Sequence, residues 1–306
     1  MQLSNALSKS RPVISVAMIV KNESHCIETC LKSVSGADEI VVVDTGSSDS
    51  TVDIAQCYTK RVFSGEDYLW SDDFAKSRNQ ALDLCVGNWV LSIDADEALE
   101  PGGMDKIHAA IAAAGDRKTI FVWMQDATDS ARHKLARVFR KETGVVWVGL
   151  GHETIAPFEQ DQHDHPADIT IFYGSSAAHK LDPDRMLRIL SKAVEEDPTN
   201  ARNLYYLARE HYYRKAWDAA VALLERYLQK STFQAEMADA HLIMARCLWS
   251  ANRGNEARAA CTQAVLYNPD CKEALTFMAT VYFEPWKHKW LRLAEAATNE
   301  DVLFIR

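Results

Sequence analysis

Two aspartates in the segment SIDADE are the residues of this sequence best suited to hold a metal ion. Asp94 and Asp96 are two positions apart, and in an extended chain residues i and i+2 point to the same side. Two carboxylates at the end of a strand suit a hard divalent cation, which takes oxygen ligands and leaves room for phosphate oxygens. Such a pair also occurs by chance in acidic loops, but its position directly after the apolar run WVLSI favours metal binding.

Further polar residues follow two other apolar runs. Asn22 and Glu23 come directly after VISVAMIV, and Asp44 ends EIVVVD before the turn-forming TGSS. In an open α/β sheet ligands bind at the carboxyl ends of the strands, so we expect these residues and Asp94 to form one site. Asp44 and Ser47, taken singly, are equally consistent with turn formers or helix caps. Their coincidence across three strand ends favours a binding site.

The elements that must position these residues alternate short apolar runs with amphipathic stretches. This pattern predicts an α/β domain with a largely parallel sheet. We expect strands at 13–20, 39–44, 61–63 and 89–97, separated by the helical segments SHCIETCLKSV, TVDIAQCY and DDFAKSRNQALDLC. Further strand-like segments are TIFVWMQ, KLARVFRK, GVVWVG and DITIFYG. The predicted organisation is an N-terminal extension at 1–12 and an α/β domain at 13–182.

The pattern changes after Pro183, where the sequence becomes helical and rich in alanine. Ala245 and Ala279 are 34 positions apart, which is the tetratricopeptide period, and Ala208 precedes Ala245 by 37 positions, which a three-residue insertion explains. A small residue at each of these positions lets two helices approach closely. Residues 183–306 are therefore expected to form an all-α domain of tetratricopeptide-like helical repeats.

Composition excludes several classes of protein. The chain has 306 residues, more than one ordinary domain needs, and its net charge of −9 disfavours a large surface that binds nucleic acid through phosphates. The sequence contains neither an apolar span of about 20 residues nor the apolar core of a secretory signal, so a cytoplasmic protein is expected. Seven cysteines without a CxxC pair indicate reduced thiols, and disfavour a disulfide framework or a zinc site.

Two other folds lack their signatures in this sequence. A dinucleotide-binding fold requires a glycine fingerprint after the first strand, where this chain reads VKNE. A phosphatase of the haloacid dehalogenase type requires its DxD pair near the N-terminus with a threonine soon after, whereas Ala98 and Leu99 follow here.

Five segments, in this order, resemble the motifs of inverting GT-A glycosyltransferases of family 2: VAMIVKNES, VVVDTGSSDST, DDFAKSRNQAL, LSIDADE and GHETI. The chain is especially similar to the bacterial branch that resembles lipopolysaccharide-core glucosyltransferases, over residues 13–180. The resemblance implies a GT-A fold, with a Rossmann-like mixed sheet, and transfer of a sugar from a nucleotide-diphosphate sugar, most often a UDP-sugar. Some members of this branch, including relatives of peptide S-glycosyltransferases, carry tetratricopeptide-like tails.

The resemblance also implies a set of nucleotide-binding residues: Asn22, Glu23, Asp44, Arg78, Asn79 and Asp94. Within it Asp44 would receive the uracil N3–H, and Asn22 and Glu23 would lie near the nucleoside. Arg78 and Asn79 would hold the base and the diphosphate. The alternative for Arg78 is a surface salt bridge to Asp72 or Asp73.

A metal site and a catalytic base complete the implied machinery. Asp96 would ligate Mn²⁺ or Mg²⁺, Asp94 would face the ribose directly or through the metal, and His179 would complete the metal site. An inverting transfer needs one carboxylate to take the acceptor proton, and Glu153 in GHETI matches that base. The alternatives are a structural, salt-bridged Glu153 and a surface or core His179.

The sequence leaves the acceptor open among a saccharide, a lipid-linked sugar, a peptide side chain and a hydroxylated nucleobase. Trp123 and Trp147 are candidates for stacking on sugar rings or for core aromatics. A basic cluster beside the predicted acceptor side keeps a nucleic-acid acceptor open, and its alternative interpretation is a solvated strand edge or a diphosphate contact by Arg137 alone. The cluster consists of Arg132, His133, Lys134, Arg137, Arg140 and Lys141. We expect the repeats to recognise an acceptor or a protein partner. The alternative function is a scaffold whose GT-A domain binds nucleotide sugar without transferring it.

Overall fold

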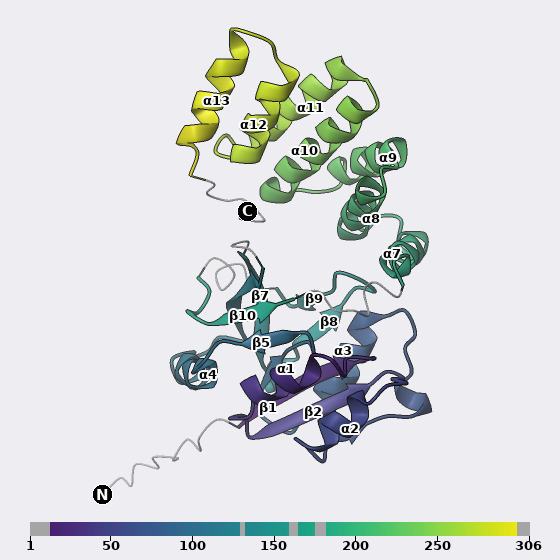
Figure 1. The fold of residues 1–306 in the computed structure, drawn as a ribbon, viewed down its shortest axis with the longest axis vertical. Helices are drawn as coiled ribbons and strands as arrows, with labels where there is room; N and C mark the ends of the chain where they lie inside the picture. Colours follow the sequence, from purple (N-terminus) through teal and green to yellow (C-terminus); the bar gives the residue numbers. More distant parts are fainter. Residues whose placement is uncertain (1–12, 129–131, 159–164, 175–181, 299–306) are drawn as a thin grey trace, which may run out of the picture. The chain divides into compact units, whose positions relative to one another are not determined.

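The structure is a computed structural model that describes residues 13–128, 132–158, 165–174 and 182–298 (Figure 1). The chain divides into two compact units. The first consists of residues 1–148 and 153–182, and the second of residues 149–152 and 183–306.

The first unit is built on a mixed sheet. Among its described residues the sheet has eight strands in the order β3-β2-β1-β4-β7-β6-β10-β5. Strands β3, β2, β1 and β4 are parallel neighbours, whereas β7 runs antiparallel to β4 and β6, and β5 antiparallel to β10. The strands are β1 (Ile14–Val20), β2 (Glu39–Asp44), β3 (Val62–Phe63), β4 (Trp89–Ser92), β5 (Glu97–Leu99), β6 (Thr119–Asp126), β7 (Arg132–Arg140) and β10 (Thr170–Tyr173). A separate antiparallel pair consists of β8 (Val146–Val148) and β9 (Thr154–Ala156).

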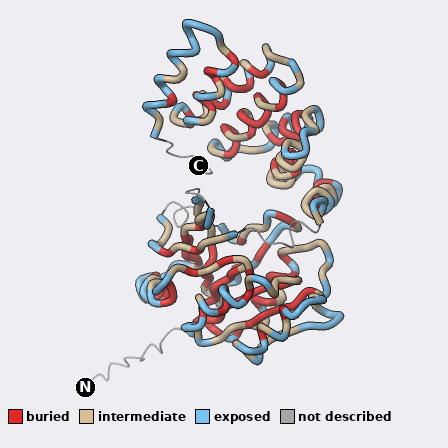
Figure 2. Tube along the Cα trace, viewed as in Figure 1, coloured by how far each residue is buried: buried red, intermediate tan, exposed pale blue. Residues whose placement is uncertain are grey.

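Helices cover both faces of this sheet, which explains why β1 is apolar on both sides. Helices α1 (Ile27–Ser33), α2 (Thr51–Gln56) and α4 (Gly103–Ala112) contribute to one apolar core, together with alternate residues of β1 such as Ile14 and Val16. Helix α3 (Phe74–Leu84) packs in a second core against the other side of β1 and β2, where Ala17 and Val43 lie. Figure 2 shows the buried chain concentrated in these layers.

The strand register brings the carboxyl ends of three strands to the same edge. Val20 at the end of β1 pairs with Asp44 at the end of β2, and Ala17 of β1 pairs with Ser92 at the end of β4. This is the arrangement expected from the sequence, and the connections that follow these strands carry the candidate site.

The strand predicted at 89–97 is wrong in its length. Residues 89–97 were expected to be one strand, but β4 ends at Ser92 and β5 begins at Glu97, with a turn between them. Hydrogen bonds between Asp94 and Glu97 close this turn, and β5 then pairs with β10 at the far end of the sheet. Helix α4 and strand β9 were not predicted.

The second unit is helical and confirms the expected repeat fold. In the part of this unit that the structure describes, three helix hairpins follow a first helix, α7 (Arg185–Glu196) (Figure 1). They are α8 (Ala201–Tyr213) with α9 (Trp217–Leu228), α10 (Gln234–Ser250) with α11 (Gly254–Tyr267), and α12 (Lys272–Val281) with α13 (Trp286–Ala296). The alanines used to identify the repeat are buried between helices: Ala208, Ala245 and Ala279. Among the described residues, no helix combines the length and apolarity that a membrane crossing requires.

Candidate active site

The connection after β1 is fixed to the connection after β2 through Asn22. Asn22 has a left-handed backbone, with φ of 58°, which asparagine tolerates better than most residues. Its backbone N–H donates to Ser47 Oγ over 2.9 Å, and its Oδ1 accepts from the Ser48 N–H over 2.7 Å. The next N–H, that of Glu23, donates to Thr51 Oγ1 over 2.8 Å. Both residues predicted at the end of β1 are therefore held beside the β2 connection.

Asp44 ends β2 and closes the turn that follows it. Its buried carboxylate accepts from the backbone N–H of Gly46 at 3.3 Å and from that of Ser47 at 3.1 and 3.2 Å. Gly46 has φ of +107°, a conformation in which a side chain would be strained. Asp44 is thus a turn former that also lies at the strand end, and its contact with uracil stays a prediction.

Arg78 on α3 joins two carboxylates that are distant in sequence. Its Nη1 lies 2.7 Å from Asp94 Oδ1, its Nη2 donates to Asp94 Oδ2 over 2.9 Å, and its Nε lies 2.6 Å from Glu153 Oε1. The Arg78 side chain and the two carboxylates that it contacts are largely shielded from water. A surface pair with Asp72 or Asp73 was the alternative, but Asp73 instead caps the N-terminus of α3. The structure therefore links the first aspartate of the DxD segment to the candidate base.

Strand β7 brings a second buried arginine to the same aspartate. Arg137 Nη2 lies 3.6 Å from Asp94 Oδ2, and it also forms a buried ion pair with Glu97. Burial alone would raise the pKa of Asp94, but the guanidinium groups of Arg78 and Arg137 overcome it and hold this pKa well below its usual range. Burial raises the pKa of Glu97 to about 7 against the opposing charge of Arg137, and the charge of Asp94 adds to the rise.

Glu97 had no role in the sequence prediction, although it lies in the same segment. Its Oε2 accepts from the Asp94 N–H over 2.8 Å, and its own N–H donates to the Asp94 carbonyl over 3.1 Å, so it closes the turn that carries both aspartates. The sequence signal that points toward such a partner is Arg137, a charged residue inside the apolar strand-like segment KLARVFRK, because an arginine that is buried there requires a carboxylate partner.

The two DxD carboxylates have different surroundings. Because Asp94 and Asp96 lie in a turn, the extended geometry expected for them is wrong. Asp94 lies beside two guanidinium groups, whose charge disfavours a directly bound cation there. Asp96 acts electrostatically on Cys26 at the start of α1, so it lies near the β1 connection. Its carboxylate fits a hard divalent cation and remains the proposed ligand. His179, the third predicted ligand, lies outside the described residues.

Asn79 has a structural role beside Arg78 on α3. Its Nδ2 donates to the Trp147 carbonyl and its Oδ1 accepts from the Trp147 N–H, both over 2.9 Å, so it holds β8 against α3. Glu153 follows the connection from β8, and its side chain is only 12% exposed. Asn79 therefore helps to position the β8–β9 hairpin, whose connection carries the candidate base Glu153. A direct contact of Asn79 with a nucleotide stays a prediction.

The two tryptophans considered for sugar stacking differ in position. Trp147 is buried, and its ring lies 5.4 Å from that of Phe139, as a core aromatic would. Trp123 is half-buried, and the Arg132 guanidinium lies 4.3 Å from its ring centroid. One interpretation of the sequence placed the basic cluster at an exposed strand edge. This interpretation is wrong for the residues on β7, because β7 lies between β4 and β6 inside the sheet.

Comparisons with known proteins agree with this architecture. A sequence model of glycosyl transferase family 2 matches residues 15–187, and one of the tetratricopeptide repeat matches residues 214–281. The SPbeta prophage-derived glycosyltransferase SunS of Bacillus subtilis is 23% identical over 310 residues, which is 94% of this chain and 72% of SunS. A TPR repeat-containing protein of Synechococcus elongatus is 30% identical over 146 residues, which is 46% of this chain but only 35% of that relative.

A similar solved structure is that of S. aureus TarS 1–349 in complex with UDP-GlcNAc. It is 15% identical, with a TM-score of 0.48, and the match covers 89% of this chain and 93% of TarS 1–349. The family 2 model covers more than half of the chain, including every described residue of the site above. The chain therefore belongs to glycosyl transferase family 2, and it carries tetratricopeptide repeats in its C-terminal part.

Proposed function

We propose that this protein is an inverting glycosyltransferase that uses a nucleotide-diphosphate sugar, with a UDP-sugar as its donor. The observation that supports this most is that Asn22, Asp44 and Asp94 lie at or just after the carboxyl ends of neighbouring strands, with Glu153 joined to Asp94 through Arg78. The ion pair taken alone also fits the alternative of a structural, salt-bridged Glu153, and the Glu153→Gln variant distinguishes the two. An inverting transfer needs a base for the acceptor and polar groups for the donor, held in a fixed relation to each other. One buried guanidinium group with both carboxylates as partners is suited to that task.

Each residue has a defined part in the proposed reaction. Glu153 takes the proton from the acceptor atom as that atom bonds to the anomeric carbon; the bond from this carbon to the diphosphate breaks, and UDP leaves. Asp44 and Asn22 bind the nucleoside, and Asp94 faces the ribose. Asp96 holds Mn²⁺ or Mg²⁺, which when bound supplies positive charge to the departing diphosphate.

Slow hydrolysis of the donor tests this proposal without knowledge of the acceptor. The full chain is incubated with Mn²⁺ and a panel of UDP-, GDP- and CMP-sugars, and the released nucleotide is measured. We expect turnover of at least one UDP-sugar above the background of the Asp96→Ala variant. Turnover of none of the donors would favour the alternative function, a repeat scaffold whose GT-A domain binds nucleotide sugar only.

The acceptor is a separate question, which the described site leaves open among saccharide, lipid-linked sugar, peptide and hydroxylated nucleobase. We propose that the tetratricopeptide repeats contribute to its recognition or bind a protein partner, because stacked helices offer a surface suited to extended ligands. Mass spectrometry of candidate acceptors after incubation with the active donor identifies the class.

A further inference from the structure

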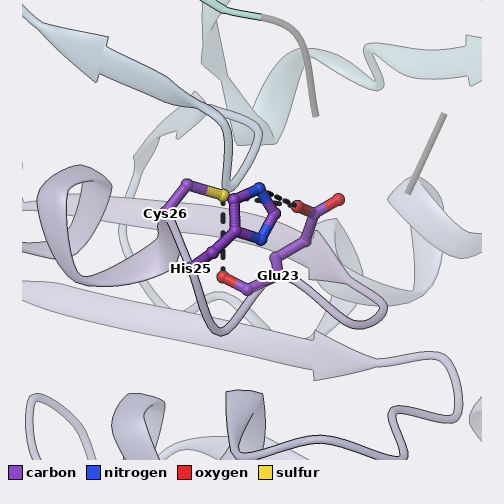
Figure 3. A group of neighbouring side chains, drawn as sticks. All are labelled: Glu23, His25 and Cys26. Carbon is purple, nitrogen blue, oxygen red and sulfur yellow. Dashed lines mark hydrogen bonds and ion pairs between the residues drawn. The ribbon is translucent and has the colours of Figure 1, made fainter. Parts of the chain in front are cut away.

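Three side chains of different chemistry meet on the connection between β1 and α1 (Figure 3). Glu23 offers a carboxylate, His25 an imidazole and Cys26 a thiol, with one ligand atom of each within 4.8 Å of the others. Cys26 Sγ donates to Glu23 Oε2 over 3.3 Å, and His25 Nε2 lies 3.9 Å from the same oxygen. Figure 3 shows the sulfur and the imidazole directed toward this carboxylate.

These separations are close to those of a tetrahedral zinc site. Zinc binds sulfur at about 2.3 Å and nitrogen or oxygen at about 2.0 Å, so tetrahedral ligand atoms are about 3.3–3.6 Å apart. The sulfur and the oxygen already have this spacing, at 3.3 Å. The imidazole must approach by about half an ångström from 3.9 Å, which a partly exposed side chain such as His25 can do.

The backbone holds the three residues in place without a metal ion. The Glu23 N–H donates to Thr51 Oγ1 over 2.8 Å, and the Ser24 N–H donates to Asp49 Oδ2 over 3.2 Å. The Glu23 carbonyl accepts from the Cys26 N–H over 3.1 Å, which fixes the turn between the first and last ligand. A preformed turn lowers the entropic cost of binding an ion.

The charge around the thiol favours a cation. Burial, the hydrogen bond to Glu23 and the charges of Glu23, Asp96 and Asp49 raise the pKa of the Cys26 thiol, so an ion must displace its proton; the same carboxylates attract a cation. We propose that Glu23, His25 and Cys26 form a binding site for a thiophilic divalent cation, Zn²⁺ foremost, with a fourth position open to water. Binding releases the Cys26 thiol proton to solvent and replaces the bond from the sulfur to Glu23 by bonds from both groups to the metal.

This site differs from the one proposed for the donor metal. The Glu23–His25–Cys26 group combines sulfur, nitrogen and oxygen, a set that suits zinc, whereas the oxygen ligands at Asp96 suit Mn²⁺ or Mg²⁺. The sequence did not indicate this site, because zinc sites are usually identified from paired cysteines and this one contains a single thiol. The proposal does not depend on transferase activity.

Cobalt substitution tests the proposal directly, because a Co²⁺ ion bound to a thiolate has a sulfur-to-metal charge-transfer absorption. The full chain, kept reduced by a phosphine, is titrated with Co²⁺ and then with Zn²⁺. We expect the absorption to appear with Co²⁺ and to disappear as Zn²⁺ displaces it. Cys26→Ser should abolish the absorption, and His25→Ala should weaken Zn²⁺ binding by about 10-fold or more, in the range that ligand-shell changes cause.

Two control variants distinguish this site from another thiol and from the donor metal. Cys57→Ser removes an exposed thiol elsewhere in the same unit and should leave the absorption unchanged. Asp96→Ala removes the proposed donor-metal ligand; because the Asp96 charge also acts on Cys26, the variant should weaken Co²⁺ binding but keep the absorption at saturating Co²⁺, so failure of donor hydrolysis does not affect this result. Circular dichroism checks that Cys26→Ser is folded, and His25 is exposed enough that its alanine variant serves as a second test. Absence of the absorption in the unmodified protein, or its persistence in Cys26→Ser, would overturn the proposal.

Discussion

An Arg78→Ala substitution should destabilise the first unit, because it leaves two shielded carboxylates without their main partner. Arg78 makes contacts of 2.6, 2.7 and 2.9 Å with Glu153 and Asp94. Removal of one partner from a buried ion pair typically costs about 3–5 kcal/mol. Arg137 stays 3.6 Å from Asp94, and the carboxylate side chains keep 27% and 12% exposure. We therefore expect the lower end, about 3 kcal/mol.

Thermal unfolding followed by circular dichroism measures this effect. In a domain of 150–250 residues, about 3 kcal/mol lowers the midpoint by roughly 6–12 °C. The control is Lys32→Ala, which removes an exposed ion pair with Glu28 on α1 of the same unit. Its midpoint should be nearly unchanged, because water and salt screen exposed pairs.

A second substitution identifies the charge responsible. Adding Glu153→Gln to Arg78→Ala removes one of the two carboxylates that have lost Arg78, so the double variant should unfold at a higher temperature than Arg78→Ala alone. Such non-additivity is expected of residues in contact. The reasoning is refuted if Arg78→Ala unfolds at the same temperature as Lys32→Ala. It is also refuted if Glu153→Gln lowers the midpoint equally with and without Arg78.

The remaining predictions concern the metal, the base, pH and the repeats. Asp96→Ala should abolish the dependence of UDP binding on Mn²⁺ in calorimetry; equal UDP affinity of the unmodified protein in EDTA would contradict a donor metal. Glu153→Gln should keep UDP affinity and lower transfer by roughly 10²–10⁴-fold, as loss of a general base does; a near-normal rate would assign the base elsewhere. The pKa of the Glu97 carboxyl is about 7 in the folded state, against an ordinary 4.5. The folded state therefore binds this proton more tightly than the unfolded chain, and the resulting stabilisation is fully present below pH 4.5 and is lost as the pH rises through 7. Urea unfolding between pH 5 and 8 should therefore show this loss, and Glu97→Gln should flatten it. His241→Ala and Arg246→Ala on α10 should preserve donor hydrolysis and lower transfer to the true acceptor, measured side by side; if both activities survive, the repeats have another role.

The sheet and the strand ends could be predicted because their signals are local. A run such as VISVAMIV is apolar on both sides, as a strand covered by helices on both faces is, and its shortness and β-branched residues favour a strand over a buried helix. Parallel neighbours then place the ends of their strands together, so Asn22 and Asp44 fall at one edge. The helical repeats were equally accessible, because alanines recur at spacings of 37 and 34 positions where helices touch.

The contacts within the site could not be predicted, because they join residues that are far apart in sequence. Arg78 is 16 positions from Asp94 and 75 positions from Glu153, and no local pattern selects these partners over the nearer Asp72 and Asp73. Tyr205 on α8 is a second example: it is buried, and its hydroxyl donates to Asp239, 34 positions away, over 2.5 Å. The burial of a polar side chain depends on packing that the sequence does not show.

The turn between β4 and β5 shows how the missing contacts change the chemistry assigned to a motif. As an extended segment, SIDADE would present Asp94 and Asp96 as equivalent metal ligands. Instead, the Glu97 carboxylate accepts a hydrogen bond from the Asp94 N–H, and the Asp94 carboxylate forms ion pairs with Arg78 and Arg137. Three carboxylates and two guanidinium groups then make up one largely shielded network, with Glu153 at one end and Glu97 at the other. The first aspartate of the motif becomes the link to the proposed base, and the metal role stays a proposal for the second.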